Sequence, residues 1–482
     1  MSGEPTTTKR TTQSSVLGPQ SLSQSSVLSP QSLFLSPQSL FLFADVSVST
    51  ILVAWFATTP IASFFIRFPY DQSIITFNRG VFALIGLLLL IRIKTEPESS
   101  AKASKGEPSA THVTRFRATP FEIAWALLSV AVLVSALLMS HDIGYAGRIA
   151  IDSFCLPLFA FRLARTHVVG RAHLRWLTLG VIAVAFFLFA TGAYELATGA
   201  DLFAYKGSRL VRAGELRVNG PFAADASYAI IALMLFLFLR AAPEALSVRF
   251  DRTSRFFYEC ALAAAAIASL LPMFRTIAVA LLASWMIVEW AGRKTLIVNR
   301  GRPIVGRWLI AALIAITVLA ATVAPALFSR RLTDPSNALS RVATWEAACA
   351  IALEHPLFGV GLANYEDSFR ARYNWEDESV EKVMDAQARS SPHSNVMWIA
   401  AELGWAMLAL YLIASVFLAR MGWRAIGRAQ SGAQRTAAAC FLALLVAYWI
   451  PGLTLTSGLY SDLNLYFFFL LGLLSNRFAL AT

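Results

Sequence analysis

The chain has 482 residues, of which 57% are hydrophobic and only 15% charged, and its formal net charge is +12. This composition excludes a soluble globular domain of ordinary make-up. Apolar runs of about 17–25 residues recur along the chain, and each is long enough to cross a bilayer core of about 30 Å. Because a lipid-facing backbone must satisfy its own hydrogen bonds, these runs predict an all-α polytopic membrane protein.

The charge and the cysteines fit the same class. Lysines and arginines of membrane proteins collect in cytoplasmic loops, so the positive charge needs no nucleic acid, and we expect no nucleic-acid partner. Cys155, Cys260 and Cys440 fall in or at the end of apolar runs and are expected to be small buried side chains. Cys349 lies in a polar segment and has no evident disulfide partner there.

Residues 1–45 form a low-complexity tail that is rich in Ser, Gln, Thr and Pro and repeats Pro-Gln-Ser-Leu three times. Regularly spaced prolines in a polar segment cannot bury a core. The tail also lacks the compact apolar region and the small-residue cleavage site of a signal peptide. We expect a disordered cytoplasmic tail or, as the alternative, a start site assigned too far upstream.

We expect twelve membrane spans, nine within 46–327 and three within 394–482, separated by a large polar loop at 328–393. The spans are expected at 47–66, 76–93, 121–139, 147–164, 176–198, 222–241, 257–273, 276–291, 306–325, 394–419, 434–452 and 461–479. The pair around Arg275 can also be one long broken helix.

The loop charges predict which side each connection faces. Alternate connections are short and basic, and they carry Lys94, Lys102, Lys105, Arg115 and Arg117, then Arg165, Arg171 and Arg175, then Arg249, Arg252 and Arg255, then Arg293, Lys294, Arg300 and Arg302, and finally Arg420, Arg424 and Arg428. Such connections are cytoplasmic by the positive-inside rule. Both termini are then expected in the cytoplasm, and the 328–393 loop outside it.

Several arginines break this rule, because they fall in the connections expected outside. They are Arg209, Arg212 and Arg217 in the loop before residue 222, Arg275 at a turn between two spans, and Arg330, Arg331 and Arg341 in the large loop. Positive charge at the edge of a membrane is costly and is a functional hypothesis by default. Guanidinium groups bind phosphate oxygens in a two-pronged way, so a lipid-linked phosphate or pyrophosphate is the simplest ligand. The alternative is pairing with the loop acids Asp334, Glu346, Glu366 and Asp367 or contact with lipid headgroups.

The large loop is expected to contain a helix over about 339–354. Val342, Trp345, Cys349 and Ala352 form an apolar stripe on it. His355-Pro356 should end the helix, because the residue before a proline is pushed out of the α region. Gly359 and Gly361 then permit a tight turn. The acidic run Glu376-Asp377-Glu378 is expected to be solvated, since no second ligand cluster supports a metal there.

His393 is the last ionisable residue before the span that begins at 394. Imidazole titrates near neutral pH, so His393 at the membrane surface can accept a proton from a hydroxyl. An N-cap or a headgroup contact is the alternative. His355 precedes a proline at a helix end and is expected to be structural, and nothing singles out His141.

Taken together, these features resemble the O-antigen ligase and polymerase superfamily of bacterial envelope glycosyltransferases. The resemblance covers roughly residues 46–480 and rests on Arg217 in Arg-Val-Asn-Gly-Pro-Phe222, Arg275, Arg341-Val-Ala-Thr-Trp345, His355-Pro-Leu-Phe-Gly-Val-Gly361 and Pro392-His393-Ser-Asn395. Two positions depart from the family pattern: Ser394 separates His393 from Asn395, and Phe274 stands where the family often has serine.

The resemblance implies a GT-C-like membrane glycosyltransferase without metal or other cofactor in the bacterial inner membrane, with a periplasmic active site. The donor would be a glycan on undecaprenyl pyrophosphate, and the acceptor a hydroxyl of lipid A-core or of another glycan. By the same resemblance Arg217, Arg275 and Arg341 would bind the pyrophosphate, and His393 would be the general base. Arg209, Arg212, Trp345 and Asn395 are candidate supporting residues.

Two alternatives stay open. A polymerase uses the same donor, and the spacing from Arg209 to Gly220 matches, once, an Arg-x10-Gly pattern associated with polymerases of the superfamily. No arginine of the large loop repeats the pattern, which favours the ligase. A solute transporter would use the intramembrane acids Asp152 and Glu402, but the spans show no inverted repeat. Asp152 can pair with Arg148 four residues earlier, and Glu402 with polar groups on another span.

Overall fold

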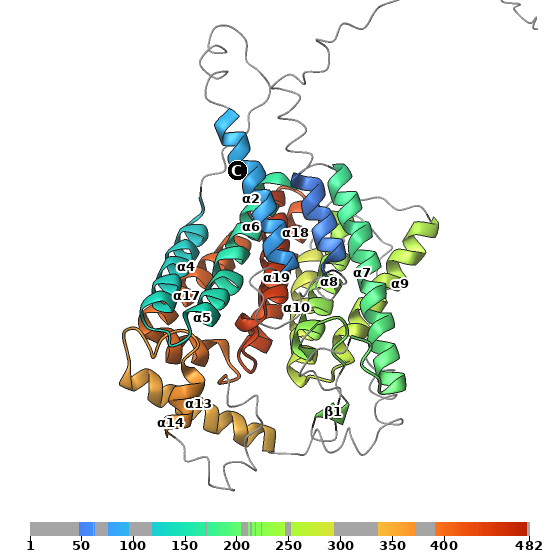
Figure 1. Ribbon diagram of the computed structural model, residues 1–482. Helices are drawn as coiled ribbons and strands as arrows, with labels where there is room; N and C mark the ends of the chain where they lie inside the picture. The colour runs from blue at the N-terminus through green and yellow to red at the C-terminus, as the bar shows by residue number, and fades with distance from the viewer. Residues whose placement is uncertain are drawn as a thin grey trace, which may run out of the picture. The chain divides into compact units, whose positions relative to one another are not determined.

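The computed structural model describes residues 48–60, 62, 76–95, 118–168, 171–203, 211–212, 215–216, 218–222, 224–245, 252–293, 336–372 and 391–479. These residues are almost entirely helical (Figure 1). The described residues also include one short hairpin, in which strand β1 (Val211–Arg212) pairs antiparallel with strand β2 (Glu215–Leu216). The 1–45 tail and the predicted span 306–325 lie outside the described residues.

The helices follow the predicted order. After a first helix at Val48–Pro60 come α2 (Phe77–Thr95), α4 (Pro120–Leu138), α5 (Ile143–Ala150), the π-helix η2 (Ile151–Cys155), α6 (Leu156–His167), α7 (Arg171–Thr198), α8 (Asp225–Ala245), α9 (Arg252–Leu270), α10 (Arg275–Arg293), α13 (Ser336–Glu354), α14 (Tyr365–Arg372), α17 (Asn395–Arg428), α18 (Gly432–Gly452), the 3-10 helix η3 (Ser457–Leu459) and α19 (Ser461–Ala479).

Six of the described helical segments are long and apolar enough to span a membrane, which confirms the predicted helical membrane class. They are Pro120–Leu138, Ile143–His167, Ala172–Thr198, Asp225–Ala245, Asn395–Arg428 and Gly432–Gly452. Val48–Pro60 and Phe77–Leu90 are shorter apolar helices. The count of twelve stays a prediction. Around Arg275 the structure contains two helices, α9 and α10, joined by a turn, and not one broken helix.

Helix α8 forms the centre of the bundle. It is apolar along most of its length, and nearly all of its residues are buried, as expected of a helix that is covered on all sides. It packs against its sequence neighbours α7, α9 and α10 and against the distant α18 and α19. The remaining helices surround this core, with α19 against α6 and α17 against α4.

Successive helical segments that cross the bundle run in alternate directions between its two ends, and α5, η2 and α6 together form one such segment, Ile143–His167 (Figure 1). At one end Asn78 Nδ2 binds Asp462 Oδ1 at 2.7 Å, and His141 N binds Asn364 Oδ1 at 3.1 Å. At the other end Ser49 Oγ binds the carbonyl oxygen of His167 at 2.7 Å. Helices α13 and α14 lie across the first end, on the same side as β1 (Figure 1). We call this the α13 end.

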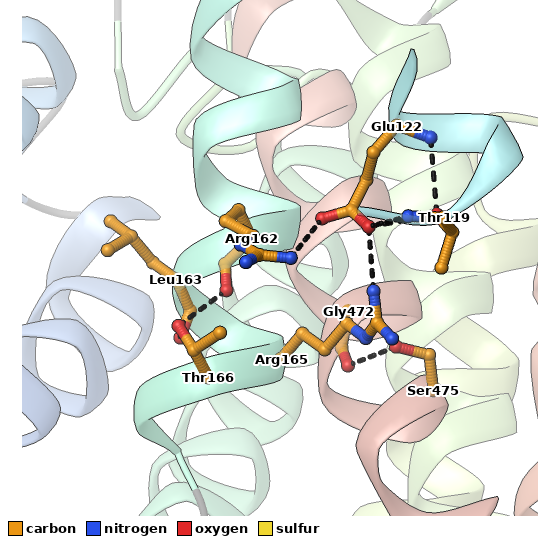
Figure 2. A network of polar contacts seen from close by, with 8 residues as sticks. All are labelled: Thr119, Glu122, Arg162, Leu163, Arg165, Thr166, Gly472 and Ser475. Atoms are coloured by element: carbon orange, nitrogen blue, oxygen red, sulfur yellow. Dashed lines mark hydrogen bonds and ion pairs between the residues drawn. The ribbon is translucent and has the colours of Figure 1, made fainter. Parts of the chain in front are cut away.

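The opposite end of α4 contains a buried ion-pair network (Figure 2). Glu122 closes a capping box with Thr119 at the start of α4. Its carboxylate also accepts hydrogen bonds from Arg162 Nη1 at 3.0 Å and Arg165 Nη1 at 2.7 Å. Breaking a buried pair of this kind typically costs about 3–5 kcal/mol, because one charge is left without its partner. The network therefore fastens α4 to α6 near the connections predicted to be cytoplasmic.

Asp152 has a partner that the sequence analysis did not consider. Its carboxylate accepts hydrogen bonds from Arg79 on α2, at 2.8 Å from Nε and 2.5 Å from Nη2. Arg148, the predicted partner, places its guanidinium 5.3 Å from the centre of the Tyr145 ring. Because the Arg79 side chain balances its charge, Asp152 can be explained as half of a structural ion pair, without a role in transport.

Candidate functional site

His393 lies on the turn that leads into α17. Its φ is 47°, in the left-handed region, which costs a non-glycine residue about 1–3 kcal/mol and is common at functional sites. Ser394 is the N-cap of α17 and accepts a hydrogen bond from the backbone N–H of Met397. The serine that separates the histidine from the asparagine therefore has a structural role. The helix begins one residue later, at Asn395.

Asn395 fastens this turn to the connection between α18 and α19. Its side chain is buried; Nδ2 donates to Ser457 Oγ at 2.9 Å, and Oδ1 accepts from Gly458 N at 2.8 Å. Asn464 Nδ2 in turn donates to the Gly458 carbonyl oxygen at 2.7 Å. A second link joins Ser391 Oγ to Thr456 Oγ1 at 2.9 Å. Buried hydrogen bonds thus hold the residues on both sides of His393. They fix the position of the His393 backbone, from which its imidazole extends.

Helix α13 carries Arg341 and Trp345 and packs against α17. The two helices share a small apolar core with α14, formed by Ala347, Ala348, Ile351, Tyr365, Phe369 and Ala401. Tyr365 OH adds a hydrogen bond to the carbonyl oxygen of Thr344 at 3.2 Å. The packing holds α13 close to the first turns of α17, which follow His393 directly.

The predicted apolar stripe on α13 coincides only in part with its buried face. Of the stripe, Ala352 is buried, Trp345 and Cys349 are half-buried and Val342 is exposed. The other buried residues of the helix are Thr344, Ala347, Ala348 and Ile351. Alanines allow α13 to approach α17 closely, which a hydrophobicity pattern dominated by larger side chains hides. Arg341 and Trp345 are half-buried. The indole Nε1 of Trp345 is buried and has no hydrogen-bond partner within the described ranges, so it can donate to a ligand.

The 355–361 motif inserts into a break in α17. Gly404 has φ 81° and ψ 174°, which interrupts the helix. The opened backbone pairs with the motif: Val360 N donates to Ala401 O at 3.0 Å, Gly361 N to Glu402 O at 2.9 Å, and Trp405 N to Pro356 O at 2.9 Å. A Cβ on Gly359 would lie 2.3 Å from the Glu402 carbonyl carbon, so only glycine fits.

We call this contact between residues 355–361 and the break in α17 the joint. The side chain of Glu402 adds hydrogen bonds next to it. Its carboxylate accepts hydrogen bonds from Ala363 N at 2.9 Å, Tyr365 N at 3.3 Å and Trp398 Nε1 at 2.7 Å. The prediction that Glu402 pairs with another span is therefore wrong. Its partners are a tryptophan of its own helix and the backbone of the polar segment. The acid holds the start of α14 against α17, which gives it a structural role.

Arg275 is exposed and begins α10, directly after the turn that separates α9 from α10. Met273 in this turn has φ 59°, and Pro272 is buried. The first backbone N–H groups of a helix and a guanidinium both favour an anion. A cation is otherwise unfavourable at a helix N-terminus, so its position supports an anionic ligand.

Of the predicted outer-loop arginines, Arg209 and Arg217 lie outside the described residues, and Arg212 lies in β1. The described residues after Arg217 are firmly held. Glu195 Oε2 accepts hydrogen bonds from Asn219 N at 3.0 Å and Gly220 N at 2.8 Å. Gly220 has φ 54° and packs against Tyr228. Glu195 was not predicted, because its partners are backbone groups.

The described candidate residues come from several elements at the α13 end. His393 lies on the turn before α17 and Asn395 begins that helix, Arg341 and Trp345 lie on α13, Arg275 begins α10, and Arg212 lies in β1. Helix α18 packs against both α10 and α17, and the connection after α18 binds Asn395. The acidic segment 376–381 lies outside the described residues.

Residues 224–412 match the family model described as O-antigen ligase. The matched region contains Arg275, Arg341, the 355–361 motif and His393. It confirms the superfamily resemblance predicted from the sequence. No curated protein matches the chain.

Proposed function

Because residues 224–412 carry an O-antigen ligase domain, we propose that the chain is an O-antigen ligase-like glycosyltransferase. It moves a glycan from undecaprenyl pyrophosphate to a hydroxyl of lipid A-core or a similar acceptor. The reaction takes place at the periplasmic face of the bacterial inner membrane, and both chain termini are cytoplasmic. In this topology the chain has twelve spans.

One observation carries the proposal: the candidate residues within the matched region lie at the α13 end of the bundle. The matched region spans α8 to the middle of α17, and Arg275, Arg341 and His393 all lie near the ends of described helices on that side. Basic groups and an imidazole at one membrane face are the parts needed to bind a lipid-linked pyrophosphate and to activate a hydroxyl.

In the proposed reaction, His393 accepts the proton of the acceptor hydroxyl as its oxygen attacks the anomeric carbon of the donor sugar. The bond from that carbon to the phosphate oxygen breaks, and its electron pair leaves with undecaprenyl pyrophosphate. Arg275 and Arg341, helped by Arg217, bind the growing negative charge on the leaving group. The fixed backbone around His393 lowers the cost of aligning the base with the hydroxyl.

An O-antigen or exopolysaccharide polymerase is the second candidate. It uses the same donor with a growing glycan as acceptor, and the Arg209–Gly220 spacing favours it. The structure adds that Gly220 is a left-handed residue bound by Glu195. A structural need for glycine there accounts for one half of the pattern without a polymerase.

Deleting the gene and separating lipopolysaccharide and free polysaccharide on a gel tests the proposal. A ligase predicts undecorated lipid A-core together with accumulated lipid-linked chains, whereas a polymerase predicts decoration with a single repeat unit. Unchanged glycans together with lost uptake of a labelled solute would overturn both and favour transport.

Complementation then tests the residues. His393→Ala and Arg341→Ala should each fail to restore the wild-type pattern, although both proteins are present in the membrane at normal amounts. Loss of one charge-stabilising group typically costs about 10²–10³-fold in rate. A wild-type pattern from either variant would remove that residue from the mechanism.

A further inference from the structure

The C-terminal end of α13 and the turn after it expose a group of large apolar side chains. Leu353 is 70% exposed, Leu357 64% and Phe358 60%. The three residues fall within six positions of one another, and all six residues from 353 to 358 are exposed. We call Leu353, Leu357 and Phe358 the apolar turn. Large apolar side chains that are exposed this close together in the chain point to an interaction surface.

The position of the apolar turn along the axis of α17 is fixed by hydrogen bonds. The bonds from Val360, Gly361 and Trp405 described above tie its backbone to residues 401–405. Trp405 Nε1 adds a hydrogen bond to the Ala352 carbonyl oxygen at 3.1 Å. The turn therefore cannot lift away from α17 unless these bonds break.

That position coincides with the expected edge of the bilayer. Arg420 ends the apolar run of α17 at the side predicted to be cytoplasmic. Counting back the roughly 20 residues that cross a bilayer core puts the opposite edge near Ala400. The break at Gly404 and the turn bound to it lie at this edge. Trp405 is partly exposed there, where tryptophan is enriched in membrane proteins.

The neighbouring surface is also apolar. A Cβ on Gly361 would lie 2.7 Å from the carbonyl oxygen of Met139, so the turn touches the end of α4. Leu138 at that end is 79% exposed. The apolar turn thus continues the outward face of a membrane span, and lipid is the occupant that already covers such a face.

The polar residues next to the turn bind one another. Glu354 accepts hydrogen bonds from Arg372 Nη1 at 3.0 Å and Nη2 at 2.9 Å, which links the end of α13 to α14. Helix α14 is rich in charged residues, and Arg370 and Ala371 on it are exposed. The charged side chain of Glu354 is thus bound to α14, and the three large apolar side chains of the turn take no part in this ion pair, which suits a membrane interface.

We propose that Leu353, Leu357 and Phe358 insert into the interface of the outer leaflet and anchor the α13–α14 segment to lipid. The anchor holds α13, and with it Arg341, at the membrane surface independently of any substrate. The inference concerns lipid contact alone and stands whether or not the glycosyltransferase proposal holds.

Spin-label accessibility on the full chain in lipid nanodiscs tests the proposal. The four native cysteines are first replaced by alanine, and single cysteines are then introduced by Leu353→Cys, Leu357→Cys and Phe358→Cys. Val416→Cys, on an exposed position of the spanning part of α17, is the lipid control, and Ala371→Cys on α14 is the water control. Only variants with the melting temperature of the cysteine-free parent are compared.

Labels on the apolar turn should collide more often with oxygen than with a water-soluble nickel chelate, as at Val416. The label at Ala371 should show the reverse order. Nickel accessibility at the turn equal to that at Ala371 would overturn the proposal, because the turn would then lie in water. Low accessibility to both reagents would also overturn it, since protein would then cover the turn.

Discussion

Two turns flank the first part of α17, and each joins a histidine to a proline. At His355-Pro356 the turn is held by backbone hydrogen bonds to the broken helix, and its side chains are exposed. At Pro392-His393 the flanking residues are held by buried side chains, and the histidine itself is left-handed. The first arrangement indicates a joint between segments, whereas the second presents one side chain. This contrast separates a structural histidine from a candidate base.

The largest expected effect on activity comes from removing the imidazole of His393, and the matched control is the same change at His355. His393→Ala should lower glycosyl transfer by about 10²–10⁴-fold, the usual contribution of a general base. His355→Ala should leave the rate within about twofold of the wild type, because the turn is held by backbone groups. Both are measured by transfer of labelled glycan in membranes.

His393→Asn is the control for the backbone. Asparagine tolerates the left-handed region better than most residues, so the variant should keep the wild-type melting temperature and still lose activity. Full activity in His393→Asn would show that position 393 matters for its conformation alone.

A large effect on folding is expected at the joint. Gly359→Ala puts a methyl group 2.3 Å from the Glu402 carbonyl carbon at a residue with φ 66°, and we expect a loss of at least about 2–4 kcal/mol. Gly427→Ala is the control, because Gly427 lies on α17, the helix of Glu402, and nothing lies within 4 Å of the added carbon. Melting curves in detergent should separate the two variants clearly, and equal curves would contradict the close packing.

A smaller effect is expected at the side-chain link. Asn395→Ala should lower stability by about 1–3 kcal/mol, because it leaves buried partners unsatisfied. Ser457→Ala should cost about 1 kcal/mol, and the double variant should lose less than the sum, since the two side chains bind each other. Additive losses would show that the link at 2.9 Å contributes nothing.

The smallest effect is expected at the exposed pair that joins α13 to α14. The hydrogen bond from Arg372 lowers the pKa of Glu354 below its ordinary value of 4.5. A lowered carboxyl pKa adds stability above the ordinary pKa, and this stability disappears as the pH falls through the folded-state pKa. Glu354→Gln should therefore melt slightly below the wild type at pH 7, and the difference should vanish in acid. A difference that grows in acid would contradict the pairing.

The described helices fall close to the predicted spans, because the length of an apolar run is a local property of the sequence. The end of α13 at Glu354 matches the expected stop before His355-Pro356. The turn at Arg275 was placed correctly, although its division into two helices was left open. What stayed hidden depends on long-range backbone contacts. Residues 359–361 pack against the break at Gly404, which lies more than forty residues further along the chain. A single glycine in an apolar run, such as Gly404, does not by itself predict a break in the helix.

The site was predicted as residue types and not as a structure. His393 and Arg341 stood out because charge near a membrane is rare. Their supports did not, because Ser457, Gly458 and Asn464 are ordinary residues in a short connection. The α13 stripe was only partly correct, because three alanines and Thr344 form most of the buried face, and hydrophobic patterns give such small side chains little weight.

The central place of α8 has a consequence for how the chain is made. Its neighbours α7, α9 and α10 are synthesised next to it, whereas α18 and α19 follow much later. A chain that ends before α18 therefore lacks the two helices that cover this flank of α8 in the finished protein, and the central helix of the bundle is completed only by the last part of the chain to be made.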